Sequence, residues 1–265
     1  MTTRRRLRAL LATLPLLLTA LVLPGAAASP PSYDLDVLGD SYGSGYGVPP
    51  YGACGRSDAA YGVQIDGRMR LRLDDFVACA GATTASLVAG GQLEALDEDT
   101  DVVTLSIGGN DIGWSSAVVA CLVGGDPQCA LASEAVRTRI TDDLPALLDG
   151  LYDDVRDAAP RAEVVVTGYP RLFSPEYGTF VAMSPAEQEV LNEGADLLNS
   201  VIAGVADQHG FTFVDVTKRF VGHGVNAADP WVLGPLDPGA FHPDAAGYAA
   251  YTEAVTAAIR PSRLR

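Results

Sequence analysis

The stretch "LDVLGDSYGSG", residues 35–45, takes an apolar run directly into a serine that is surrounded by glycines. An apolar run that alternates and then ends in glycine is typical of a strand that enters a turn. This turn contains Gly39, Gly43 and Gly45, which is more glycine than a structural turn requires. The glycines leave room around Ser41, so the stretch predicts either a nucleophile at a strand end or an ordinary turn residue.

Four more apolar runs have the length of strands and end in glycine or polar residues. They cover residues 73–84, 100–111, 162–170 and 211–217. Residues 73–84 alternate before a glycine, as residues 33–40 do, and the continuous Val, Ile and Leu runs are typical of strands buried on both faces of a parallel sheet. Together with residues 33–40, they predict a sheet of five strands.

Helical patterns separate the predicted strands. Apolar residues recur at three- and four-residue steps over 136–155, where Pro145 marks a kink or a restart. Ser184 and Glu187 form a capping box at the start of a longer helix. A last helix is expected over 244–259. Strands that alternate with helices predict a doubly wound α/β fold, in which ligands bind at the carboxyl ends of the strands.

Three glycine-rich turns follow three of the predicted strands. Ser41, Gly81 and the "GGND" segment at residues 108–111 each come just after the carboxyl end of a different strand. Because the carboxyl ends of parallel strands lie at the same edge of a sheet, we expect the three turns to form one site.

A serine hydroxyl becomes a nucleophile when a neighbouring base, usually a histidine, accepts its proton. The chain has three histidines. His209 ends a helix, where a positive charge is favourable in its own right, and His223 has the setting of a structural loop residue. His242 directly precedes the last helix, so its loop can return to the edge that holds Ser41. Ser41 is therefore the candidate nucleophile and His242 the candidate base.

Acyl transfer also requires hydrogen-bond donors for the oxyanion that develops in the transition state. The backbone amides of Ser41 and Gly81 and the side-chain amide of Asn110 are available. Taken singly, Gly81 is an ordinary turn residue and Asn110 an ordinary helix cap. Their positions at three strand ends favour an oxyanion hole.

Four segments resemble the four sequence blocks of the SGNH, or GDSL-type, hydrolases: "GDSYGSG" (39–45), "CAGATT" (79–84), "GGND" (108–111) and "FHPDAAGY" (241–248). Their flanks resemble secreted actinobacterial lipases and esterases of that family. The resemblance implies a three-layer α/β/α sandwich, the flavodoxin-like SGNH hydrolase fold with a five-stranded parallel sheet. It also implies carboxylic-ester hydrolysis through an acyl-enzyme, without metal or cofactor. Ser41 would be the nucleophile, His242 the base, and Ser41, Gly81 and Asn110 the oxyanion hole.

One position departs from the pattern of many relatives. Where they have an aspartate three residues before the histidine, this chain has Gly239. Asp237 and Asp244 are close in sequence but at a different spacing. We therefore expect the backbone carbonyl of Gly239 to accept a hydrogen bond from His242. A carbonyl fixes the tautomer but stabilises the imidazolium less than a carboxylate does.

The chain has four cysteines. An even number in an exported protein is typical of disulfides. Of the three possible pairings, local order favours Cys54–Cys79 and Cys121–Cys129. A zinc site is the alternative, but the chain has no C-x-x-C pair and no histidine close to the cysteines in sequence.

Residues 1–28 have the pattern of a secretory signal peptide. Four arginines precede an apolar stretch, and small residues follow up to Ala28. The apolar stretch is interrupted by Pro15 and is short for a membrane-spanning helix, so we expect cleavage rather than a membrane anchor. Both the general and the twin-arginine export routes remain open. Residues 29–265 would then be a single SGNH hydrolase domain, secreted to the extracellular space.

The formal net charge is −15 at pH 7. An acidic surface repels nucleic-acid phosphates and anionic lipid, so neither is expected as a partner. We expect a monomer that hydrolyses small-molecule or lipid esters. Two alternatives remain open, a carbohydrate O-deacetylase and a non-catalytic carbohydrate- or lipid-binding module on the same fold. The sequence does not give the acyl-chain preference.

Overall fold

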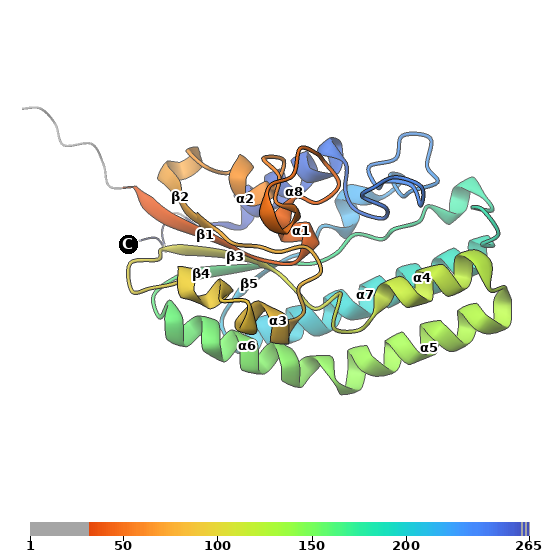
Figure 1. Cartoon of the computed structure of the whole chain (residues 1–265), viewed down its shortest axis with the longest axis horizontal. Helices are drawn as coiled ribbons and strands as arrows, with labels where there is room; N and C mark the ends of the chain where they lie inside the picture. The colour runs from red at the N-terminus through yellow and green to blue at the C-terminus, as the bar shows by residue number, and fades with distance from the viewer. Residues whose placement is uncertain (1–31, 261, 263, 265) are drawn as a thin grey trace, which may run out of the picture. The chain divides into compact units, whose positions relative to one another are not determined.

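A computed structural model describes residues 32–260, 262 and 264, and the structural statements below refer to these residues. Their centre is a five-stranded parallel sheet (Figure 1). The strands are β1 (Tyr33–Gly39), β2 (Leu71–Phe76), β3 (Val102–Ser106), β4 (Glu163–Thr167) and β5 (Thr212–Val214). The expected parallel sheet of five strands is confirmed. The expected signal peptide lies outside the described residues.

The strand order is β2-β1-β3-β4-β5. The chain leaves β1 toward β2 on one side, and β3 then pairs with the other side of β1. Such a reversal creates a crevice beyond the carboxyl ends of the two diverging strands, which is where α/β proteins bind ligands. Ser41 follows the carboxyl end of β1 and therefore lies at this crevice.

Helices cover both faces of the sheet, as the three-layer prediction requires. In Figure 1, α2 and α8 lie over one face, and α3, α6 and α7 lie over the other. The helices α4 and α5 extend beyond the carboxyl ends of the strands and pack along α7. The bounds are α1 (Ser41–Ser44), α2 (Tyr61–Gln64), α3 (Thr84–Ala89), α4 (Trp114–Val123), α5 (Asp126–Asp142), α6 (Leu144–Ala158), α7 (Pro185–Gln208) and α8 (Ala245–Ala258).

Local sequence signals explain several helix boundaries. The predicted capping box opens α7, because the Ser184 side chain accepts from the Glu187 amide and the Glu187 carboxylate accepts from the Ser184 amide. Pro145 marks a restart: α5 ends before it, and the proline lies in the first turn of α6. Asp244 caps α8 by accepting a hydrogen bond from the Gly247 amide.

Two disulfides are present, Cys54–Cys79 and Cys121–Cys129, in the pairing that local order favours. The first joins the segment after α1 to the segment after β2, close to Gly81. The second joins the end of α4 to the start of α5. Within residues 32–260, no helix combines the length and the hydropathy that a membrane span needs.

Candidate active site

Ser41 is the first residue of the one-turn helix α1. Asp40 caps this helix through a 2.9 Å hydrogen bond that its carboxylate accepts from the Tyr42 amide. Gly39 has a φ of +132°, and a Cβ there would lie 2.4 Å from the Ser106 carbonyl oxygen. Only glycine allows β1 to turn so close to the end of β3. The turn thus presents Ser41 at the crevice edge, largely buried.

His242 reaches Ser41 from a loop that immediately precedes α8. Its Nε2 lies 2.7 Å from the Ser41 Oγ, and its Nδ1 lies 2.9 Å from the Ala240 carbonyl oxygen. The Tyr42 hydroxyl donates to the Phe241 carbonyl at 2.7 Å, which connects the Ser41 turn to the loop of His242. The Nδ1–H that donates to a carbonyl leaves Nε2 free to accept the serine proton.

The Nδ1 atom of His242 donates to the Ala240 carbonyl at 2.9 Å, one residue after the expected Gly239. The Gly239 carbonyl accepts from the backbone amide of His242 at 2.9 Å, and it also acts on the imidazole, whose pKa both carbonyls raise. Asp237 accepts from the Gly234 amide and Asp244 caps α8, so neither carboxylate is paired with the imidazole.

Burial lowers the pKa of His242 from its usual 6.5, against the opposing effect of the Ala240 and Gly239 carbonyls. A lowered pKa keeps the imidazole neutral near pH 7. A neutral imidazole is the form that can take a proton from a serine hydroxyl.

The three predicted oxyanion donors lie on adjacent turns. Ser41 is the first helical residue, so its N–H has no partner within α1. Gly81 has a φ of +84°, with open space where a Cβ would be. The Asn110 side chain donates to the Ala82 carbonyl at 2.9 Å, which joins the second turn to the third. Because a carboxamide has two N–H groups, one remains for a ligand.

Asp40, which directly precedes Ser41, is a buried carboxylate that accepts several hydrogen bonds. Its carboxylate accepts hydrogen bonds from the Tyr169 hydroxyl at 2.6 Å, the Tyr42 amide at 2.9 Å and the Ser106 hydroxyl at 3.1 Å. Burial raises its pKa to about 6, and these hydrogen bonds oppose the rise. Tyr169 follows β4, so the strand-end argument that selected Gly81 and Asn110 could have selected it too.

The remaining candidate residues have structural partners. His209 lies 2.8 Å from the Asp149 carboxylate at the end of α7. His223 stacks on Trp231 with ring centroids 3.7 Å apart. Asp111 accepts from the amide and the hydroxyl of Thr84 and so braces the start of α3.

A mostly apolar hollow, partly open to solvent, lies beside the site. Tyr42, Gly109 and Tyr169 line it next to the site, and most of the other lining residues are apolar residues of α4, α5 and α7. Two aromatic side chains, Tyr42 and Trp114, are part of this lining. A hollow of this composition suits a hydrocarbon chain.

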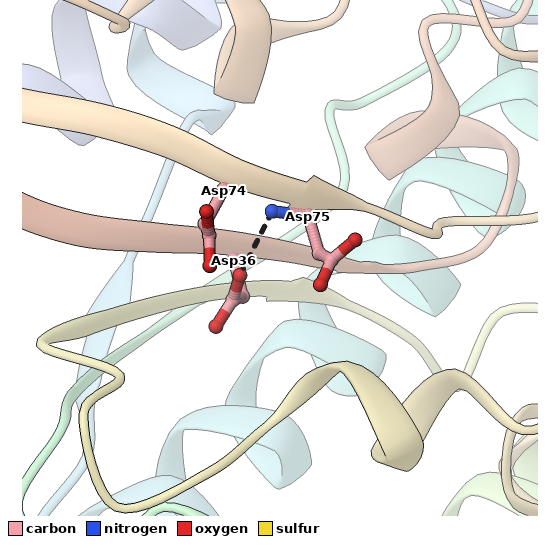
Figure 2. Close-up of side chains that lie close together, drawn as sticks. All are labelled: Asp36, Asp74 and Asp75. Carbon is pink, nitrogen blue, oxygen red and sulfur yellow. Dashed lines mark hydrogen bonds between the residues drawn. The ribbon is translucent and has the colours of Figure 1, made fainter.

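Figure 2 shows Asp36, Asp74 and Asp75, which lie on β1 and β2 away from Ser41. Their carboxylate oxygens lie within 4.8 Å of one another, which is close enough for a cation. However, Asp36 already accepts from the Asp75 amide at 3.0 Å and from the Thr100 hydroxyl at 2.7 Å. Exposed acidic groups often gather without an ion, so we assign no metal site to this cluster.

Comparison with known proteins gives concordant results. A family profile described as "GDSL-like Lipase/Acylhydrolase family" matches residues 37–250. Lipase 1 of Streptomyces coelicolor is 38% identical over 83% of this chain and 85% of its own length. A lipase of Streptomyces rimosus is 37% identical over 91% of this chain and 93% of its own length.

Solved structures agree with the sequence relatives. The crystal structure of an extracellular lipase from Streptomyces rimosus has a TM-score of 0.82 at 35% identity and covers 86% of this chain and 100% of its own. Phospholipase A1 from Streptomyces albidoflavus has a TM-score of 0.80 at 35% identity, with the same coverage. Because the family profile spans most of the chain and the related lipases share its full fold, this chain belongs to the GDSL-like lipase/acylhydrolase family and is a GDSL-type lipase or esterase.

Proposed function

We propose that Ser41 is the nucleophile and His242 the general base of ester hydrolysis by an acyl-enzyme route. The observation that carries this proposal is the 2.7 Å distance between Ser41 Oγ and His242 Nε2. The contact of Nδ1 with the Ala240 carbonyl supports it, because that bond fixes the tautomer whose Nε2 accepts a proton. The pair is a dyad oriented by a backbone carbonyl.

The reaction has two matched halves. Ser41 Oγ attacks the ester carbonyl carbon while its proton passes to His242 Nε2. The carbon–oxygen bond to the alcohol then breaks, and Nε2 returns the proton to the departing oxygen. Water attacks the acyl-serine with His242 as base, and the carboxylic acid leaves as Ser41 Oγ regains the proton. The N–H groups of Ser41, Gly81 and Asn110 stabilise the oxyanion in both halves.

The test is hydrolysis of p-nitrophenyl esters from acetate to palmitate by the wild type and by Ser41→Ala. Loss of the nucleophile should reduce kcat by at least about a thousand-fold. Ser200→Ala, on the exposed surface of α7, is the control and should retain activity. A fluorophosphonate should label the wild type on Ser41 only. Full activity in Ser41→Ala would reject the proposal, and an unlabelled, inactive wild type would favour a binding module.

We propose that the substrate is an ester whose acyl chain occupies the apolar hollow between α4, α5 and α7. Its lining includes Ala117, Val118 and Val136, which give a hydrocarbon chain a dry contact surface. The hollow begins at Tyr42 and Gly109, next to Ser41 and Asn110. This position favours acyl chains longer than acetate over the O-deacetylase alternative.

Gly194 offers a direct test of this substrate class. It lies on α7, lines the hollow and has no atom within 4 Å of the position that a Cβ would take. Gly194→Leu should fill the hollow and reduce kcat/KM for palmitate at least tenfold relative to acetate, since several buried methylenes lose their contacts. Gly204→Leu, also on α7 and equally unobstructed but outside the hollow, is the matched control. Equal chain-length profiles in the two variants would exclude this acyl site.

We further propose export with removal of residues 1–28, and a monomeric, extracellular product. The two disulfides support an oxidising compartment, and the similar Streptomyces rimosus lipase is extracellular. N-terminal sequencing of protein from the culture medium should begin at Ser29. A medium that lacks the protein, or a product that begins at Met1, would contradict this assignment.

A further inference from the structure

Tyr169 is held rigidly just beyond the end of β4. Asn199, on α7, accepts from the Tyr169 amide at 2.8 Å and donates to the Tyr169 carbonyl at 2.8 Å. Gly168 permits this close approach, because a Cβ there would lie 2.6 Å from the Asn199 Oδ1. The backbone of Tyr169 is therefore fixed to α7 on both sides of its Cα, and its side chain extends toward the site.

The hydroxyl of Tyr169 makes two hydrogen bonds of opposite sense. It donates to the Asp40 carboxylate at 2.6 Å and accepts from the Gly109 amide at 3.1 Å. Asp40 directly precedes Ser41, and Gly109 directly precedes Asn110. A single buried oxygen thus joins the turn that carries the nucleophile to the turn that carries the proposed side-chain oxyanion donor.

The ring of Tyr169 completes this connection. It meets the Tyr42 ring edge-to-face with centroids 5.0 Å apart. The Tyr42 ring in turn lies 5.2 Å from His242, and its hydroxyl donates to the Phe241 carbonyl. The Tyr169–Asp40 pair is therefore connected to all three proposed groups, the nucleophile, the base and the side-chain oxyanion donor.

We propose that Tyr169 is a positioning residue for the esterase reaction, whose hydroxyl sets the distance between the Ser41 turn and the Gly109–Asn110 turn through Asp40. This inference rests on the proposed roles of Ser41 and Asn110. Tyr169 touches no reacting atom in this scheme. It acts because reacting groups lose activity steeply when their spacing changes by about an ångström.

The environment of Asp40 also predicts how activity should depend on pH. The groups that face its carboxylate are the Tyr42 and Gly43 amides, the Ser106 hydroxyl and the Tyr169 hydroxyl. The buried phenols of Tyr61 and Tyr248 also lie within its field. His242 lies beyond the Tyr42 ring. In residues 32–260, no Lys, Arg or His forms an ion pair with Asp40.

Because Asp40 has no cationic partner, its donors keep it ionised. The Tyr169 hydroxyl is the strongest of the hydrogen bonds that oppose the raised pKa of about 6. Removing that hydroxyl should raise the pKa of Asp40 further. Because the ionised Asp40 is the form that accepts these hydrogen bonds, activity should then be lost at a higher pH as the carboxylate takes up a proton.

The experiment compares Tyr169→Phe with Tyr152→Phe in the full chain, using p-nitrophenyl butyrate well below the melting temperature of each. Tyr152 is the matched control, because its buried hydroxyl on α6 has no hydrogen-bond partner among the residues that the structure describes. For Tyr169→Phe, kcat should fall about 10- to 100-fold with a KM change under threefold, since the ring is retained. The acid limb of kcat/KM should move to higher pH. Tyr152→Phe should match the wild type in both respects.

A double-mutant cycle with Asp40→Asn separates positioning from general destabilisation. If Tyr169 acts through Asp40, the double variant should lose little more activity than the worse single variant. Where Tyr169→Phe does not fold, 3-fluorotyrosine at position 169 replaces it. This isosteric, more acidic donor should move the acid limb to lower pH.

Three results would overturn the inference. They are a Tyr169→Phe kcat within twofold of the wild type, additive losses in the double variant, and an acid limb that neither substitution moves. Failure of the proposed function itself would be seen separately, as full activity in Ser41→Ala.

Discussion

Asp36 and Asp40 lie on the same stretch of chain, within β1 and just past its end, and differ in what surrounds them. Both are almost fully buried, at 1% exposure each. Burial raises the pKa of both carboxyls to about 6. Asp36 accepts from Thr100 and from the Asp75 amide, on the side of the sheet away from the active site. Asp40 accepts from the Tyr42 amide beside the proposed nucleophile, and from Ser106 and Tyr169 at the ends of two neighbouring strands.

This comparison shows that burial and a raised pKa do not by themselves identify a functional carboxylate. Asp36 even has the more suggestive surroundings, with two further aspartates close by (Figure 2). Its two donors, Asp75 of β2 and Thr100 of the loop before β3, only connect β1 to these neighbouring segments. The donors of Asp40 include Tyr169, which also holds Gly109 beside the proposed oxyanion donor. The partners of a buried acid, and the position of those partners in the fold, decide its role.

The largest expected effect comes from exchanging each acid for its amide. Asp40→Asn places an N–H₂ group where the Tyr169 hydroxyl now donates, so that contact is lost and kcat should fall about 10-fold or more. Asp36→Asn perturbs only the bonds to Thr100 and Asp75, and its kcat should stay within twofold. Steady-state kinetics on p-nitrophenyl butyrate measure both. Equal losses in the two variants would remove the distinction between the two acids.

The sequence predicted those parts of the site that depend on strand ends. Ser41, Gly81 and Asn110 follow β1, β2 and β3, and the carboxyl ends of neighbouring parallel strands must lie together. Their relative placement therefore needed only a correct assignment of strands and glycine turns. The five-stranded sheet could be predicted in part for the same reason, because β3 and β4 are nearly continuous apolar runs and β1 is an apolar run that ends in glycine. Strand β2 contains Arg72, Asp74 and Asp75 and gives a weaker signal.

The acceptor for His242 could not be predicted in this way. It depends on the dihedral angles of one loop, in which Phe241 has a φ of +61° and turns the Ala240 carbonyl toward Nδ1. The Gly239 carbonyl, one residue earlier, accepts from the backbone amide of His242 and also acts on the imidazole. The spacing of residues in the sequence does not show which carbonyl faces Nδ1. Long-range contacts set the conformation of this loop, such as the hydrogen bond of the Tyr42 hydroxyl with the Phe241 carbonyl.

The pH dependence of stability sharpens the comparison further. A carboxyl with a raised pKa holds its proton in the folded state after the unfolded chain has released it, so its contribution to stability falls as pH rises from about 4 through 6. For Asp40 this loss is on the order of 3 kcal/mol between about pH 4 and pH 7. The free energy of unfolding of the wild type and of Asp40→Asn can be measured with urea across this window. As pH rises, the wild type should lose stability relative to the variant.

Salt should distinguish the two acids by a smaller effect. The charges of Asp75 and Asp74 contribute to the raised pKa of Asp36, whereas burial and hydrogen bonds set the pKa of Asp40. Adding about 0.5 M NaCl screens charges at the exposed β2 edge, so the pH-dependent stability difference between the wild type and Asp36→Asn should shrink. The corresponding difference for Asp40→Asn should stay constant. If salt changes both differences alike, the two carboxyls share one electrostatic environment and the contrast drawn between them fails.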